Sequence, residues 1–118
     1  MRAVILAGGE GTRLRPLTLD VPKPLVPILG KPFIERQLTH LRSYGVTEVT
    51  LALTRNRYSD TLRQALAASA CGVQLTYAYE DVPLGSGGAI AGAARGWDEP
   101  FLVCNGDIVT DVDLGALM

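Results

Sequence analysis

Glycine and basic residues gather near the start of the chain at a spacing suited to binding an anion. Gly8, Gly9 and Gly11 follow an apolar run, and glycines let a backbone turn sharply and approach a ligand without interference from a Cβ atom. The successive N–H groups of such a turn form a concave nest that binds anions. Arg13 adds a planar, permanently charged group that matches phosphate oxygens. Lys23 lies between two prolines, which restrict its backbone to extended conformations and so aim the side chain. These residues predict a phosphate-binding loop.

Two better-known phosphate loops do not fit this segment. The dinucleotide-binding fingerprint requires a third glycine where this chain has Leu14, and the second expected strand ends in Leu53-Thr54 without the acidic residue that holds a ribose. A Walker A loop requires Gly-Lys-Ser/Thr, which the sequence lacks. A plain turn between a strand and a helix would explain the glycines alone, but not the two cations that follow them.

Two later segments also carry residue types that chemistry uses. The run Pro83 to Gly88 is a second glycine-rich loop, although Gly87 and Gly88 would also suit close packing of a helix on a sheet. Asp107 follows Asn105-Gly106 directly after an apolar run. An aspartate directly after a strand stands where ligands of parallel sheets bind. The alternative for Asp107 is an ordinary turn aspartate.

Apolar patterns predict alternating strands and helices. A continuous apolar run is typical of a strand covered on both faces, whereas apolar residues at i, i+3, i+4 and i+7 predict a helix. The strands expected are Ala3 to Ala7, Val46 to Thr54, Val73 to Glu80 and Phe101 to Cys104, with Cys104 as a packed core thiol. The helices expected are one that begins at Pro32 and ends before Gly45, then Tyr58 to Leu66 and Ala89 to Arg95, with a long loop from Gly8 to Gly30. His40, on the first helix, is expected at the surface.

Strands separated by helices predict an α/β fold, a Rossmann-like, doubly wound and mostly parallel sheet with helices on both faces. Ligands of such folds bind at the loops that follow the carboxyl ends of the strands. Three loops qualify: the one from Gly8 onward, Asp81 to Gly88, and Asn105 to Asp107. The unusual residues of the sequence lie in these three loops, so we expect them to form one site.

The stretch from Leu6 to Pro24 resembles the signature of the nucleoside-diphosphate-sugar pyrophosphorylases, the sugar-1-phosphate nucleotidyltransferases, written roughly GGxGTRLxPLTxxxPKP. Pro83 to Ile90 is similar to the second glycine-rich loop of that family, and Asn105 to Asp107 to its metal-binding turn. The resemblance covers essentially all 118 residues and is strongest to mannose-1-phosphate guanylyltransferases. It implies a GT-A-like nucleotidyltransferase core.

The resemblance also implies a role for each matching residue. Arg13 and Lys23 would be catalytic, and Asp107 would bind the cofactor Mg²⁺. Asn105 and the Gly85 to Gly88 backbone would face the nucleoside. The implied nucleotide-binding set is Leu6, Ala7, Gly8, Gly9, Gly11, Thr12, Arg13, Lys23, Gly85, Gly88 and Asn105.

The activity that the resemblance implies is transfer of a nucleotidyl group from a nucleoside triphosphate to a sugar 1-phosphate, with GTP and mannose 1-phosphate as the expected substrates. The alternatives are a uridylyltransferase acting on another sugar 1-phosphate, and a non-catalytic nucleotide-binding or regulatory subunit of the same superfamily. A formal charge of −1 gives no basic field for nucleic acid or an anionic membrane. The expected compartment is the cytoplasm, and a homo-oligomer is compatible with the sequence.

The chain ends within the first turn of an expected helix that Asp113 would cap. In the family that the chain resembles, a sugar-binding half with a second acidic metal ligand follows this region. We therefore expect residues 1–118 to be the nucleotide-binding half of a truncated nucleotidyltransferase domain, with the sugar-binding half absent. These residues alone are expected to show weak or no turnover.

Overall fold

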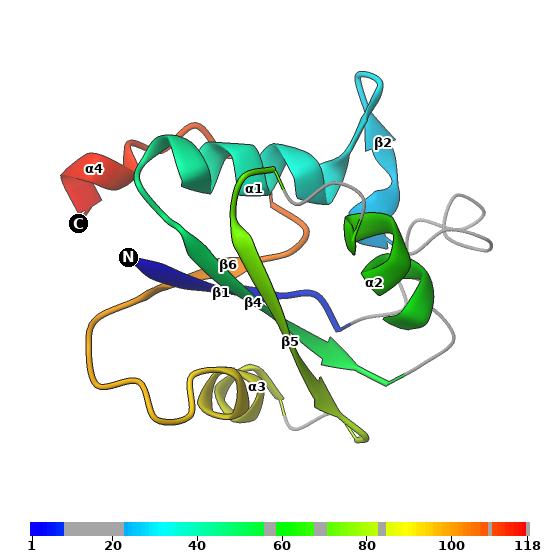
Figure 1. Ribbon diagram of the computed structural model, residues 1–118, viewed down its shortest axis with the longest axis vertical. Helices are drawn as coiled ribbons and strands as arrows, with labels where there is room; N and C mark the ends of the chain where they lie inside the picture. Colours follow the sequence, from blue (N-terminus) through cyan, green and yellow to red (C-terminus); the bar gives the residue numbers. More distant parts are fainter. Residues whose placement is uncertain (9–22, 56–58, 68–70, 83–84, 109, 118) are drawn as a thin grey trace.

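The computed structural model describes residues 1–8, 23–55, 59–67, 71–82, 85–108 and 110–117. Its centre is a four-stranded parallel sheet in the order β5-β4-β1-β6, which crosses the middle of the molecule in Figure 1. The strands are β1 (Arg2–Leu6), β4 (Glu48–Thr54), β5 (Gln74–Glu80) and β6 (Leu102–Asn105). The predictions for Gly9, Gly11, Thr12 and Arg13 fall outside the described residues.

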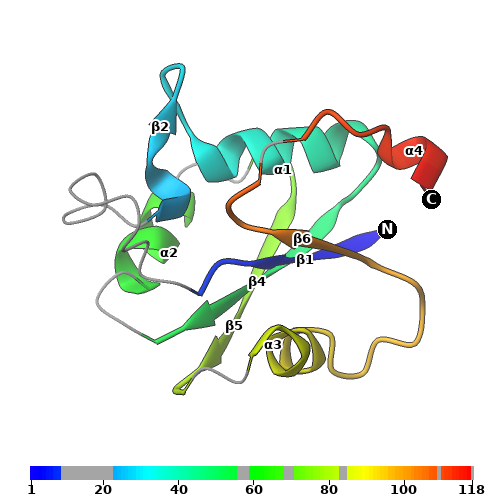
Figure 2. The same ribbon diagram turned by 180° about the vertical axis from the view of Figure 1, so that it is seen from behind.

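Helices cover both faces of the sheet, which confirms the doubly wound α/β fold. Helices α1 (Phe33–Ser43) and α2 (Ser59–Ala67) lie on one face and α3 (Gly85–Ala93) on the other, as Figure 2 shows from behind. Right-handed crossovers require this arrangement, because the chain moves outward from β1 to β5 and then returns to add β6 on the other side of β1. A short helix, α4 (Leu114–Leu117), follows β6 and lies near the end of α1 (Figure 1).

The core under α1 and α2 is built from large aliphatic side chains. In α1, Ile34, Leu38 and Leu41 follow the predicted helical spacing and are all buried. Pro32 is the residue before the helix rather than its first turn, with φ −53° and ψ 140°. Gly45 ends the helix at φ 88°, as predicted, because that left-handed conformation favours glycine.

The face under α3 is covered by small side chains. Its buried cluster is Val4, Ala52 and Ala93, against which Trp97 and Phe101 pack. Alanine and glycine let a helix approach a sheet closely, and their burial contributes less than that of leucine or isoleucine, since the gain scales with buried apolar area. This face is therefore the less filled of the two.

Three predictions about local structure are wrong. Gly85 to Gly88 was expected to be a loop, but these residues form the start of α3. The expected loop up to Gly30 contains the short 3-10 helix η2 (Lys23–Leu25), and the hairpin strand β2 (Pro27–Ile28), which pairs with β3 (Lys31–Pro32). His40 is not a plain surface residue: it is half-buried, and its Nε2 atom is buried without a hydrogen-bond partner among the described residues.

Two of these differences have the same cause, which is packing between segments distant in the sequence. Helix α3 lies across β1, β4 and β5, and that packing outweighs the poor helix propensity of its glycines. The His40 ring packs edge-to-face on Tyr44, with ring centroids 5.3 Å apart, and it lines a pocket with Ile108 and Val112 from the segment after β6. Within the described residues, none of the helices combines the length and apolar character needed to span a bilayer.

Candidate functional site

The carboxyl ends of β1 and β6 lie side by side at the place where the strand order reverses. The chain leaves β1 toward β4 and β5, whereas β6 lies on the opposite side of β1, with Leu6 paired to Asn105. In open parallel sheets, ligands bind in the crevice outside such a switch point, because the adjacent loops diverge there. Two of the three predicted loops, the one beginning at Gly8 and the one containing Asp107, start at this crevice.

Two glycines allow the strands to approach each other at the crevice. The N–H of Gly106 donates to the carbonyl of Leu6 at 2.8 Å, and a Cβ atom on Gly106 would lie 2.6 Å from that same oxygen. A Cβ atom on Gly8 would lie 2.8 Å from Oγ1 of Thr54 at the end of β4. Gly8 therefore has a packing role besides any approach to a ligand.

Lys23 and Asp107, which are 84 residues apart in sequence, meet at this crevice. Nζ of Lys23 lies 3.0 Å from Oδ2 of Asp107, and both side chains are partly exposed. The backbone at Lys23 is not extended as predicted, because Lys23 begins η2 and its carbonyl accepts from the N–H of Val26 at 3.1 Å. The buried Pro24 anchors that turn, so the lysine is still aimed into the site.

A pocket of 260 Å³ surrounds the Lys23–Asp107 pair. Three of its nine lining residues, Pro24, Ser86 and Gly106, were not individually predicted as site residues. The other six were predicted to bind the nucleotide or the metal: Leu6, Ala7, Gly8, Lys23, Asn105 and Asp107. Ser86 comes from the first turn of α3, whose free N–H groups favour negative charge. The pocket thus combines a cation, a carboxylate and a helix N-terminus.

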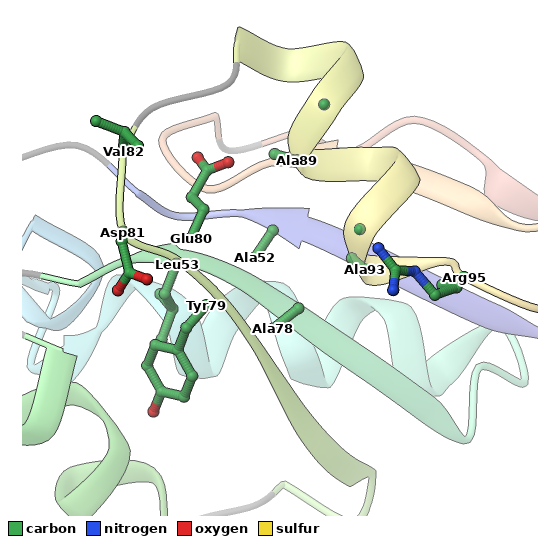
Figure 3. A pocket seen from close by; sticks show the side chains of 12 residues that line it. Ala52, Leu53, Ala78, Tyr79, Glu80, Asp81, Val82, Ala89, Ala93 and Arg95 are labelled. Atoms are coloured by element: carbon green, nitrogen blue, oxygen red, sulfur yellow. The ribbon is translucent and has the colours of Figure 1, made fainter.

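Gly85 and Gly88 do not line this pocket. Gly85 is exposed, and Gly88 lines a neighbouring pocket of 530 Å³ between α3 and the ends of β4 and β5 (Figure 3). In Figure 3 the carboxylate of Glu80 points toward the first half of α3, whereas Tyr79 points to the other side of β5. Oγ1 of Thr54 donates to Oε1 of Glu80 at 3.4 Å. This second pocket has small apolar residues along its floor, and its charged lining residues are Glu80, Asp81 and Arg95.

The chemistry of the first pocket suits Mg²⁺ carried by a phosphate ligand. Asp107 supplies a carboxylate whose side chain is 48% exposed. Over the described residues, no three His, Cys, Asp or Glu side chains gather as a metal site. Mg²⁺ commonly takes one or two carboxylates and completes its shell with substrate phosphates and water, so a single aspartate fits an ion that arrives with its ligand.

Gln37, which contacts the Asp107 turn, was not among the predicted site residues. Gln37 of α1 donates from Nε2 to the carbonyl of Asn105 at 2.7 Å and to that of Ile108 at 3.1 Å. The sequence did contain a sign of this role, because Gln37 follows Ile34 by three residues and so falls on the helix face that is otherwise apolar. A polar residue on such a face needs hydrogen-bond partners.

Comparison with known proteins agrees with this geometry. The family model described as nucleotidyl transferase matches residues 2–118. The chain belongs to the nucleotidyl transferase family. Among relatives in this family, a mannose-1-phosphate guanylyltransferase of Mycobacterium tuberculosis is 40% identical over 119 residues, which cover 98% of this chain. A D-glycero-alpha-D-manno-heptose 1-phosphate guanylyltransferase of Campylobacter jejuni is 38% identical over 117 residues, which cover 99% of it.

A solved structure shares the fold. HddC from Yersinia pseudotuberculosis, complexed with GMP-PN, superposes with a TM-score of 0.85 at 36% identity over 98% of this chain. The chain spans 32% of the Mycobacterium tuberculosis relative and 52% of both the Campylobacter jejuni relative and the HddC chain.

Proposed function

We propose that residues 1–118 form the nucleotide-binding half of an enzyme that transfers a nucleotidyl group from a nucleoside triphosphate to a sugar 1-phosphate, releasing pyrophosphate. GTP and mannose 1-phosphate are the proposed substrates. The observation that carries the proposal is the convergence of Lys23 and Asp107 on one pocket at the switch point of the sheet. A cation and a carboxylate at that place suit a triphosphate that carries its own Mg²⁺.

The reaction requires positioning and neutralisation of charge more than covalent chemistry. An oxygen of the sugar phosphate attacks the α-phosphorus in line, the bond from that phosphorus to the bridging oxygen breaks, and pyrophosphate leaves. Lys23 would hold the nucleotide and the incoming sugar phosphate together, and Arg13 would neutralise the departing pyrophosphate. Mg²⁺, held by Asp107, would supply neutralisation of phosphate charge. Loss of Arg13 is expected to lower the rate by about 10³–10⁵, as for arginines in related phosphoryl transfers.

The second pocket supports the guanylyl reading. Its volume of 530 Å³ and its apolar floor suit a nucleoside, and Glu80 lines it. Guanine has an N1–H and an amino group on one edge, and an ionised carboxylate accepts two such donors at once. Uracil offers a single N–H there. The relatives named as guanylyltransferases support the same choice.

Two alternatives share the fold and the first pocket. A uridylyltransferase would bind UTP in place of GTP, and a regulatory subunit would bind nucleotide without turnover. Release of pyrophosphate from GTP, measured on the full-length protein with mannose 1-phosphate, distinguishes these alternatives.

The expected result is pyrophosphate release that requires both the sugar phosphate and Mg²⁺ and is lost in Lys23→Ala. Binding of nucleotide without pyrophosphate release from any of several sugar 1-phosphates would leave the regulatory alternative. Residues 1–118 alone are expected to bind nucleotide with little or no turnover, and robust synthesis by them would refute that part. The cytoplasmic location and a homo-oligomer remain predictions.

Base choice is tested by thermal shift with GTP, UTP, dTTP, ATP and CTP, each with Mg²⁺. GTP should give the largest shift. Glu80→Gln removes a charged acceptor, so the preference for GTP over UTP should fall by about 10-fold or more, the effect of losing a hydrogen bond to a charged group. Glu99→Gln, at an exposed position outside both pockets, is the matched control. Equal shifts for all five nucleotides, or a larger shift with UTP than with GTP, would refute GTP as the nucleotide substrate.

A further inference from the structure

The turn that carries Asp107 is tied to helix α1 by one side chain. The Nε2 group of Gln37 donates to the carbonyls of Asn105 and Ile108, which lie on the two sides of Asp107, at 2.7 and 3.1 Å. A single amide thus spans the turn from end to end. The two acceptors also fix the orientation of the amide, because only its NH₂ group can donate to two carbonyls.

The orientation leaves a polar atom in an unfavourable place. Oε1 of Gln37 is buried and has no hydrogen-bond partner among the described residues. An unpaired buried carbonyl is destabilising, so leucine or methionine would serve better than glutamine if the residue were retained only for packing. The contact that offsets this cost is the pair of bonds to the Asp107 turn.

The other contacts of the turn differ in kind. The N–H of Gly106 is bonded to the carbonyl of Leu6, which fixes the start of the turn against β1. The ion pair of Asp107 with Lys23 is partly exposed, and such pairs contribute little to stability because water and salt screen them. Gln37 alone of these three connects the turn to a helix, and that helix is anchored in the core by Ile34 and Leu38.

We propose that Gln37 is a positioning residue that holds the Asn105–Ile108 turn so that the Asp107 carboxylate faces the nucleotide pocket. The metal part of this inference rests on the proposed function, because it assumes that Asp107 receives Mg²⁺ with a triphosphate. The positioning part concerns the unliganded protein and does not depend on it. Gln37 lines neither the Lys23–Asp107 pocket nor the 530 Å³ pocket, although it does line the separate pocket that His40 shares with Ile108.

The test replaces Gln37 by methionine, which has a similar length and no hydrogen-bonding group. Arg36→Met is the matched control, because Arg36 is the preceding residue of α1 and also donates to two backbone carbonyls, those of Ile28 and Leu29 in the β2–β3 hairpin. Both variants lose two hydrogen bonds to a loop. Only the Gln37 variant loses them at the Asp107 turn.

The first readout is amide hydrogen exchange in the unliganded full-length protein. In Gln37→Met, exchange at Gly106 to Ile108 should quicken by about 10-fold, the effect of losing one or two intramolecular hydrogen bonds, with the amides of β1 and β4 unchanged. In Arg36→Met the turn should exchange as in the original protein. An unchanged turn in Gln37→Met, or the same quickening in every strand, would overturn the proposal.

The second readout is calorimetric affinity for GTP, with Mg²⁺ and with excess EDTA. Gln37→Met should weaken binding by about 10-fold with Mg²⁺ and leave it unchanged in EDTA, since only the metal contact depends on Asp107. Equal weakening in both conditions would overturn the metal part. Should the original protein bind no GTP at all, the proposed function fails, while hydrogen exchange still decides the positioning part. Gln37→Glu, which has nearly the same shape but no donor when ionised, replaces the methionine variant if that one does not fold.

Discussion

The two faces of the sheet differ in the size of the side chains that cover them. Under α1 and α2, thirteen buried residues form one cluster, most of them leucine, isoleucine or valine. Under α3, the described residues give a buried cluster of only Val4, Ala52 and Ala93. The pocket of 530 Å³ lies on this second face, where alanine and glycine leave space between helix and sheet (Figure 3).

The difference indicates that stability and ligand space are separated in this fold. Large aliphatic side chains fill the α1 face and contribute most of the apolar burial. Small side chains keep the α3 face open next to the switch point, where Lys23 and Asp107 meet. A change on one face should therefore alter mainly stability, and a change on the other should alter mainly nucleotide affinity.

The largest effect is expected from truncating the α1 face. Leu38 is fully buried between α1 and the sheet, and Leu38→Ala leaves a cavity that the surrounding core fills only in part. The free energy of unfolding should fall by about 2–5 kcal/mol, measured by urea denaturation. GTP affinity of the folded variant should stay within about 2-fold of the original. A loss below 1 kcal/mol would show that the two faces do not differ as described.

A smaller and different effect is expected from filling the α3 face. Ala89 lies in α3 and lines the 530 Å³ pocket, so Ala89→Leu places a longer side chain in the proposed nucleoside site. The free energy of unfolding should change by less than about 1 kcal/mol, because the pocket has room and leucine suits a helix. GTP affinity by calorimetry should fall by about 10-fold or more, the cost of overpacking a site. Ala91→Leu, an exposed position of the same helix outside that pocket, is the control and should bind normally.

The smallest effect is expected from pH, at a thiol on the α1 face. Burial raises the pKa of Cys104 above its ordinary value of 9.0, so the unfolded chain loses this proton first. The corresponding stability is present below the pKa of the unfolded thiol and is lost as pH rises through the folded one. The free energy of unfolding should therefore fall from about pH 8 to pH 10, and fall less steeply in Cys104→Ala. Tyr77, whose pKa desolvation also raises, is present in both proteins, so the difference between the two curves reports the thiol. Parallel curves would contradict this prediction.

The sequence predicts the fold well wherever a pattern is local. The apolar run of β1, the spacing of Ile34, Leu38 and Leu41, and Gly45 after α1 each follow from neighbouring residues. The capping of α4 by Asp113 is confirmed too, since Oδ1 of Asp113 accepts from the N–H of Ala116 at 3.1 Å. Because these strands and helices alternate along the chain, right-handed crossovers then predict a doubly wound sheet.

Features that depend on contacts between distant segments could not be predicted from the sequence. The helical state of Gly85 to Gly88 depends on packing across three strands. His40 shares a pocket with the segment after β6, and Gln37 donates to the carbonyls of Asn105 and Ile108, which are distant in sequence. The meeting of Lys23 with Asp107 was predicted only as far as their loops, because the strand order sets their distance.

The central claim is that the Lys23–Asp107 pocket binds a magnesium triphosphate. The most direct measurement is titration calorimetry of the full-length protein with GTP and Mg²⁺, comparing Lys23→Ala with Lys31→Ala, an exposed lysine of the β2–β3 hairpin. Lys23→Ala should weaken binding by about 10-fold or more, as expected for loss of a charged hydrogen bond, and Lys31→Ala should bind as the original does. Equal affinity in all three proteins, or no heat from any of them, would contradict the claim.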